Sequence, residues 1–292
     1  MKNPFNYFTH KFDPSNFTLV MTILVKNEAD IIETNIRTHA ALGVDAFVVM
    51  DNDSTDGTRE ILAKLQNEFE ITIYDEKEPY NQKKFMTKLA FKAKDLYNAD
   101  WIINNDADEF WIPNDGLNLK NHLKYKGGVL RVARSNMILH EGIKNWWESK
   151  YQVINQINYR FGEPNIILGH TARKTIVNPH GLIKINAGNH SAEHIALLKK
   201  KEINDIHVYH YPIRSYKQFE STVLVRKNHP KNKLNNRFGT HYRRWIQLYD
   251  EGKLEEEYNN FIFKHDEVSV MKKINLLGEN TLPAKIINSI IN

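Results

Sequence analysis

The chain has 292 residues, 41% of them hydrophobic and 26% charged, which is typical of a globular protein with a sizeable core. It contains no cysteine, so disulfides, thiolate metal sites and a cysteine nucleophile are excluded. The net charge of +5 suits nucleic acid, anionic lipid or a phosphorylated substrate as partner. Because no apolar run has the length of a signal peptide or a membrane span, we expect a cytoplasmic protein.

Strands and helices are predicted to alternate over the first hundred residues. Apolar, β-branched runs at 17–25, 46–50, 70–74 and 99–103 are typical of strands buried on both faces. Apolar residues at helical spacing predict helices over 28–42, 61–69 and 85–96. This alternation predicts an α/β fold with a mostly parallel sheet and helices on both faces.

The second half is less regular. Residues 127–134 indicate a hairpin or a turn into a strand, short strands are predicted at 166–168 and 174–177, and helices over 215–228 and 241–262. Ser215 is placed to cap the first of these helices. Residues 265–292 form a lysine-bearing, partly amphipathic tail, which either packs on the domain or contacts a membrane surface.

Polar stretches at 26–28, 51–58 and 104–110 each follow a predicted strand. Because the carboxyl ends of parallel strands meet at one edge of a sheet, these stretches are expected to converge. Asp106 and Asp108 stand two residues apart, so on an extended chain both face one cation, and oxygen ligands suit Mg²⁺ or Mn²⁺. The alternative is a solvated acidic turn. Neither a P-loop nor a glycine-rich dinucleotide motif is present, so carboxylates, amides and a metal would have to hold a nucleotide.

These motifs, in this order, resemble glycosyltransferase family 2, whose fold is the Rossmann-like GT-A type, and Asp106-Ala107-Asp108-Glu109-Phe110 is similar to the motif of a bacterial subgroup. The resemblance is strong over 17–112. It implies a nucleotide-sugar donor such as a UDP-sugar, a Mn²⁺ or Mg²⁺ ion on its diphosphate, and inverting transfer to an acceptor hydroxyl. On this basis 1–212 is the GT-A domain, with a nucleotide-binding half (17–112) and an acceptor half (113–212), and 213–292 is a helical C-terminal extension.

The resemblance also assigns roles by position. Asp51 would contact the nucleoside, Asp106 would lie by the ribose and the metal, and Asp108 would hold the ion. Common members have Asp-Asp-Gly-Ser where this chain has Asp51-Asn52-Asp53-Ser54. The residues predicted to bind the donor are Val25, Asn27, Glu28, Asp51, Asn52, Lys88 and Asp106. Lys88 shares with Lys83 and Lys84 the predicted role of placing positive charge near the phosphates.

Such enzymes often add a histidine ligand from the second half of the chain. We expect His190, which follows Gly188, to complete a metal site with Asp106 and Asp108, and His210 is the second choice. For the general base we expect Glu141, with Glu148 and Glu193 as alternatives that spacing does not separate.

Three functions compete. The first is a glycosyltransferase acting on a glycan or lipid-linked glycan such as lipopolysaccharide or capsule, with no nucleic acid partner. The second is another metal-dependent nucleotide or phosphoryl-transfer enzyme, which would need a basic glycine-rich loop after the first strand. The third is a basic binding module, which leaves the acidic residues at the strand ends unexplained and lacks the aromatic residues of an RNA-binding sheet.

Overall fold

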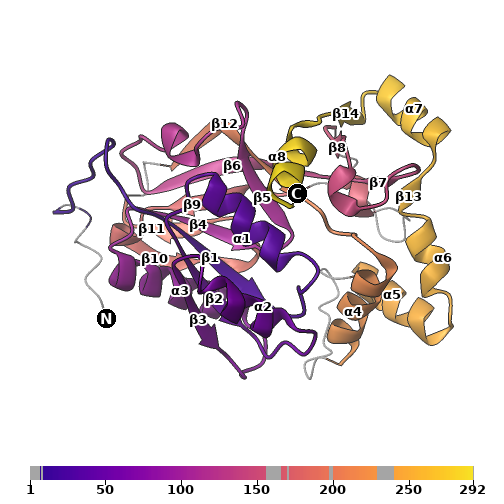
Figure 1. Ribbon diagram of the computed structural model, residues 1–292, viewed down its shortest axis with the longest axis horizontal. Helices are drawn as coiled ribbons and strands as arrows, with labels where there is room; N and C mark the ends of the chain where they lie inside the picture. Colours follow the sequence, from indigo (N-terminus) through magenta and orange to yellow (C-terminus); the bar gives the residue numbers. More distant parts are fainter. Residues whose placement is uncertain are drawn as a thin grey trace. The chain divides into compact units, whose positions relative to one another are not determined.

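The computed structural model describes residues 7, 9–155, 166–169, 171–196, 200–228 and 240–291. The chain forms two compact units (Figure 1). The first comprises 1–134, 172–208 and residue 291, and the second comprises 135–171, 209–290 and residue 292. The proposed functional division at residue 212 stays a prediction.

A large sheet forms the centre of the first unit. In the part of the chain that the structure describes it has eight strands, in the order β3-β2-β1-β4-β9-β6-β12-β5. Along the chain these strands are β1 (Leu19–Val25), β2 (Ala46–Asp51), β3 (Ile71–Asp75), β4 (Trp101–Asp106), β5 (Glu109–Pro113), β6 (Val129–Asn136), β9 (Lys174–Val177) and β12 (Lys200–His210). A separate antiparallel pair is formed by β10 (Leu182–Ile185) and β11 (Ala192–His194).

The sheet changes direction at β4. Strand β1 runs parallel to both β2 and β4, and β2 runs parallel to β3, whereas β9 is antiparallel to β4 and to β6. In this register Val25 is paired with Asp51, and Leu24 is paired with Asp106. The ends of three predicted strands therefore lie at one edge, and the predicted α/β class with a mostly parallel sheet is confirmed.

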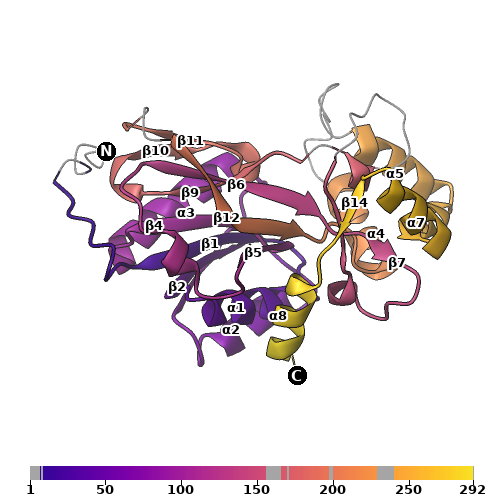
Figure 2. The ribbon, with the colours of Figure 1, turned by 90° about the horizontal axis from the view of Figure 1, so that it is seen from above.

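Helices cover both faces of the parallel strands. Figure 2 shows α1 (Ile32–Ala41) and α2 (Thr58–Leu65) on one side of the sheet and α3 (Gln82–Tyr97) on the other. Side chains alternate between the faces of a strand, so every second residue of β1 and β2 meets α3. The core on that side includes Val20, Leu24, Val48, Met50, Phe85, Leu89 and Ala93. Short 3-10 helices occur at Leu119–His122, Pro179–Gly181 and Ala187–Asn189.

The second unit is mainly helical. Its strands form short pairs, β7 (Leu139–His140) with β13 (Ile262–Phe263) and β8 (Tyr151–Val153) with β14 (Leu277–Glu279). Its helices are α4 (Tyr216–Lys227), α5 (Thr240–Asp250), α6 (Leu254–Asn259), α7 (His265–Lys273) and α8 (Leu282–Ile291), with 3-10 turns at Trp146–Glu148 and Ile166–Leu168. Ser215 caps α4 as predicted, its side chain accepting a hydrogen bond from the Gln218 N–H at 3.2 Å. No helix among the described residues is both long and apolar enough to cross a lipid bilayer.

Two local predictions were wrong. The predicted strand at 166–168 is a 3-10 turn, and the Ile167 carbonyl accepts a hydrogen bond from the Asn136 side chain at 2.7 Å. A run of three apolar residues has no periodicity, so it does not distinguish a buried turn from a strand. The predicted helix over 241–262 is broken at Gly252, which has a φ of +72°, and its last residue begins β13. Glycine adopts this left-handed conformation readily and ends a helix there.

Candidate functional site

The loops after β1 and β2 are tied together by hydrogen bonds. The Asn27 N–H donates to the Ser54 hydroxyl at 2.9 Å, and the Thr55 N–H donates to the Asn27 side chain at 2.8 Å. Lys26 donates to the carbonyl oxygens of Asn52 at 2.6 Å and Asp53 at 3.0 Å. Two of the polar stretches singled out in the sequence thus form one structure at the end of the parallel strands.

Asp51 and Asn52 differ in how their side chains are used. One carboxylate oxygen of Asp51 accepts a hydrogen bond from the Ser54 N–H at 2.8 Å, and the other is buried without a hydrogen-bond partner. The Asn52 side chain donates to the carbonyl oxygens of Glu76 and Glu78, each at 2.9 Å. Asn52 therefore fixes the chain after β3, whereas Asp51 keeps an acceptor oxygen that a ligand's N–H or O–H group can satisfy.

The other predicted donor-binding residues lie around these loops. Val25 ends β1, is buried, and accepts a hydrogen bond from the Asn52 N–H at 2.9 Å. The Glu28 N–H donates to the Thr58 hydroxyl at 2.9 Å. Lys88, on α3, forms an exposed ion pair with Glu76 at 3.2 Å.

Asp106 is held by three donors at the end of β4. Its Oδ1 accepts hydrogen bonds from the Gln82 and Asn189 side chains, each at 3.0 Å, and its Oδ2 is ion-paired with Lys174. A carboxylate has about four lone-pair sites. Three of these sites are already used, so Asp106 is mainly an anchoring group with one site left for a ligand.

Lys174 is a site residue that the sequence analysis missed. It is the first residue of β9, its side chain is 1% exposed, and its Nζ lies 2.9 Å from Glu109 Oε1 as well as against Asp106. Burial lowers the pKa of Lys174, but the charges of Asp106 and Glu109 outweigh this effect and raise the pKa above its usual value. Arg134 also pairs with Glu109 Oε1, at 2.6 Å. The available signal was a lysine at the start of a short strand pattern that is otherwise uncharged.

A side chain of α1 holds the backbone of the turn that contains Asp108 and Glu109. The Asn35 side chain donates to the carbonyl oxygens of Ala107 at 2.8 Å and Glu109 at 2.9 Å, and its own oxygen accepts from Asn105 at 3.1 Å. This buried contact fixes the backbone that aims Asp108. Polar residues on the core face of α1 were also missed, because the helix was predicted from its apolar residues alone.

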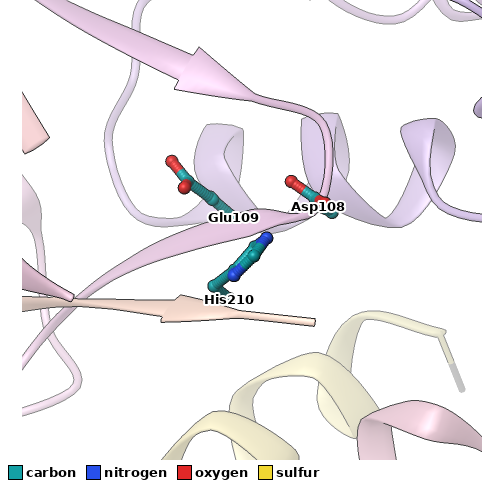
Figure 3. A group of neighbouring side chains, drawn as sticks. All are labelled: Asp108, Glu109 and His210. Atoms are coloured by element: carbon teal, nitrogen blue, oxygen red, sulfur yellow. The ribbon is translucent and has the colours of Figure 1, made fainter. Parts of the chain in front are cut away.

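The turn between β4 and β5 also carries the strongest metal-binding signal in the described part of the chain. Figure 3 shows Asp108 and Glu109 with His210, which ends β12, the strand that pairs with β5 in the sheet. One ligand atom from each of these three side chains lies within 4.8 Å of the other two. Glu109 is fully buried, and its Oε2 has no hydrogen-bond partner. An unsatisfied buried carboxylate oxygen next to a second carboxylate and an imidazole fits a divalent cation.

His190 lies in the same unit as Asp106, after the Ala187–Asn189 turn. Burial, together with the positive charges of Lys174 and Arg134, lowers its pKa to about 4, so the ring is neutral at pH 7. Its Nδ1 lies 3.1 Å from the Arg173 carbonyl and must donate to it, which leaves the lone pair on Nε2. In this tautomer Nε2 is available to bind a metal, but the metal-ligand group identified above contains His210, the second choice, and not His190.

The general-base candidates lie in different surroundings. Glu141, in the second unit, is exposed and accepts a hydrogen bond from the His265 N–H at 3.2 Å. Glu148 accepts from the Lys144 backbone at 2.8 Å, and this contact, with that from Asn145, lowers its pKa and makes it a weaker base. Glu193 is ion-paired with Lys184 at 2.6 Å. Glu141 therefore stays our prediction.

No curated protein matches the chain. Among solved structures, S. aureus TarS 1-349 in complex with UDP-GlcNAc is similar, with 12% sequence identity and a TM-score of 0.44, covering 84% of this chain and 73% of that one. The same fragment in complex with UDP has 13% identity and a TM-score of 0.42, covering 80% and 70%. Glucosyl-3-phosphoglycerate synthase from Mycobacterium tuberculosis, in complex with Mn²⁺, UDP and glucosyl-3-phosphoglycerate, has 15% identity and a TM-score of 0.30, covering 41% and 45%.

The family model described as glycosyl transferase family 2 matches residues 21–177. This range contains the tied loops after β1 and β2, the Asp106–Glu109 turn and Lys174, and it is more than half of the chain. The chain therefore belongs to glycosyltransferase family 2 and is a nucleotide-sugar glycosyltransferase.

Proposed function

We propose that this glycosyltransferase moves a sugar from a UDP-sugar, with Mn²⁺ or Mg²⁺ bound, to a hydroxyl group of a bacterial surface glycan such as lipopolysaccharide or capsule. The observation that supports the donor and the metal is the Asp106–Glu109 turn, whose carboxylates lie at the same edge of the sheet as buried Asp51. The acceptor part rests on the resemblance of the Asp-Ala-Asp-Glu-Phe motif.

The residues would divide the work as follows. Asp51 would bind the nucleoside through its carboxylate oxygen that has no hydrogen-bond partner. Val25, Asn27 and Glu28 would line the pocket for the base. Asp108 holds the metal, with Asp106 beside it and an imidazole from His190 or His210. When bound, the cation offsets the negative charge that grows on the leaving diphosphate. Lys88 adds positive charge near the phosphates of the donor.

Transfer with inversion also needs a base on the acceptor side. Glu141 would take the proton from the acceptor hydroxyl at its carboxylate as that oxygen attacks the sugar carbon. Its exposed carboxylate, with one oxygen hydrogen-bonded to the His265 N–H, leaves the other oxygen available to a substrate. Proton removal at this carboxylate makes the hydroxyl a better nucleophile as the bond to the diphosphate breaks.

A calorimetric titration tests the donor and the metal together. UDP is titrated into the wild type with and without Mn²⁺, and into Asp108→Ala and Asp115→Ala. Asp115 is the control because its exposed carboxylate follows the opposite end of β5. We expect UDP binding that requires Mn²⁺, is lost in Asp108→Ala and is unchanged in Asp115→Ala. A wild type that binds no nucleoside diphosphate with either metal would contradict the proposal.

The acceptor suggests where the enzyme works. We propose that it works in the cytoplasm and visits the inner face of the cell membrane through its C-terminal tail. Val270 and Ile274 are exposed on and just after α7, beside Lys272 and Lys273. Apolar and cationic side chains together favour an anionic lipid surface. Binding to phosphatidylglycerol vesicles should fall in a Val270→Ser, Ile274→Ser double variant, and equal binding by this variant and the wild type would argue against membrane contact.

A further inference from the structure

Two side chains join Asp106 to the backbone of Gly188 by separate routes. Gln82, in the first turn of α3, donates from Nε2 to Asp106 Oδ1 at 3.0 Å and accepts at Oε1 from the Gly188 N–H at 2.7 Å. Lys174 donates from Nζ to Asp106 Oδ2 and to the Gly188 carbonyl at 2.9 Å. The four residues form a closed ring in which both polar backbone groups of Gly188 are fixed to one carboxylate.

The ring is partly buried, and its cation is buried almost completely. Lys174 is 1% exposed, and Asn189, which is fully buried, adds a further hydrogen bond to Asp106 at 3.0 Å. Hydrogen bonds of buried charged groups are strong, and removing one partner leaves the other unsatisfied. The ring is therefore a rigid connection between the end of β4 and the turn that carries Gly188.

Gly188 has a conformation and a neighbour that fix the position of His190. Its φ is +74°, and a Cβ atom built there would lie 2.4 Å from the His190 ring. The imidazole consequently covers the glycine. Holding Gly188 against Asp106 thus also sets the distance between His190 and the acidic turn.

The ring also sets the charge of the turn. Asp106, Asp108 and Glu109 bring three negative charges, and Lys174 and Arg134 bring two positive ones, which leaves a formal charge of −1. Without the buried cation the same turn would repel a diphosphate more strongly. One divalent cation makes the turn net positive, which suits the diphosphate of the donor.

We propose that Gln82 and Lys174 are positioning residues, a clamp that holds the Ala187–His190 turn against the end of β4 so that the metal and the donor's diphosphate bind there. The ligand assigned to the clamp, which is the donor's diphosphate with its metal, rests on the proposed function. The hydrogen bonds that form the clamp do not. Both residues act through Asp106 and Gly188, and neither is assigned a contact with the reacting atoms.

The experiment compares Gln82→Leu, Lys174→Met and the double variant with Lys184→Met. Lys184 is the matched control because its ion pair with Glu193 connects the neighbouring strands β10 and β11, and its side chain is 35% exposed. Two quantities are measured on the full chain: amide hydrogen exchange across 186–190, and the Kd for UDP in the presence of Mn²⁺. Amide hydrogen exchange shows whether the clamp holds the turn, and it needs no bound ligand.

We expect faster exchange at the Gly188 amide and a Kd raised about 10- to 100-fold in each single variant, as for other residues that position metal ligands. The double variant should bind about as weakly as the weaker single variant, because opening either side opens the ring. Lys184→Met should behave as the wild type. Should Lys174→Met fail to fold, Gln82→Leu alone decides, since it removes no charge.

The outcomes separate the two proposals. Unchanged exchange across 186–190 in Gln82→Leu would overturn the clamp. Faster exchange with an unchanged Kd would overturn its role in donor binding. A wild type that binds no UDP would overturn the proposed function and the clamp's ligand together, while the exchange data would still decide whether the clamp exists.

Discussion

Acidification should destabilise the protein through His39, a fully buried residue of α1. Its Nε2 accepts a hydrogen bond from the Trp111 N–H at 3.0 Å, so Nδ1 carries the proton and donates to the Asn35 carbonyl at 2.8 Å. This arrangement needs a neutral ring. Burial, only partly opposed by the bond to Asn35, lowers the pKa of His39 from 6.5 to about 4.

The direction and the size of the change in stability with pH follow from this pKa. Because the folded protein holds the pKa below its unfolded value, the unfolded chain binds more protons between pH 6.5 and pH 4, and stability falls as the pH falls. Each pH unit between the two values corresponds to about 1.4 kcal/mol, so the full loss is about 3 kcal/mol. Between pH 7 and pH 5 the contribution of His39 falls by about 2 kcal/mol.

Urea unfolding followed by tryptophan fluorescence measures this loss. His39→Gln is expected to be less stable than the wild type at pH 7, but to lose about 2 kcal/mol less on going to pH 5. Thr38→Val, at an equally buried and untitratable neighbour, should keep the pH dependence of the wild type. If His39→Gln lost as much stability as the wild type between these pH values, the assignment of the acid sensitivity to His39 would be wrong.

Three further predictions concern the site. Asn35→Ala leaves the Ala107 and Glu109 carbonyls without their donor, so it should lower the free energy of unfolding by about 2–3 kcal/mol and weaken Mn²⁺ binding. Unchanged stability in urea titrations together with unchanged Mn²⁺ affinity in calorimetric titrations would contradict the role of α1. Gly188→Ala should weaken Mn²⁺-dependent UDP binding more than Gly57→Ala, since both have positive φ but only the first meets a clash; equal affinities would refute this. Glu141→Gln should reduce the transfer rate at least about 100-fold with UDP affinity unchanged, and an unchanged rate would remove it as the base.

The sequence was sufficient for the parallel half of the first unit. Strand pattern and order brought Asp51 and Asp106 to one edge, because parallel strands in register end together. The polar ring around Asp106 was not predictable in the same way. Lys174 reaches Asp106 through the antiparallel pairing of β9 with β4, a contact across 68 residues. Such pairings depend on which edges of the sheet are free to pair with a further strand, and local sequence patterns do not predict this.

Some of the residues missed in the sequence could have been found from the spacing of polar residues, which a search for apolar periodicity does not consider. Asn35 and His39 stand four residues apart on the face of α1 that also carries Ile32 and Ile36, and all four are buried. Polar residues repeated at i and i+4 on a core-facing stripe indicate a buried polar network. Gln82 left no such signal, because it lies in the exposed first turn of a helix whose partner in space, Gly188, follows about a hundred residues later.

The position of β5 at the edge of the sheet has a consequence for synthesis of the chain. Among the described strands β5 pairs with β12 alone, and the Asn114 N–H donates to the Asp205 carbonyl at 2.9 Å just beyond it. At about 5–20 residues per second, a ribosome needs roughly 5–20 s to make the ninety or so residues between the two strands. During that time the Asp106–Glu109 turn has its contact with Asn35 but not its flanking strand, and a nascent chain released before β12 lacks the His210 imidazole that lies near Asp108 and Glu109.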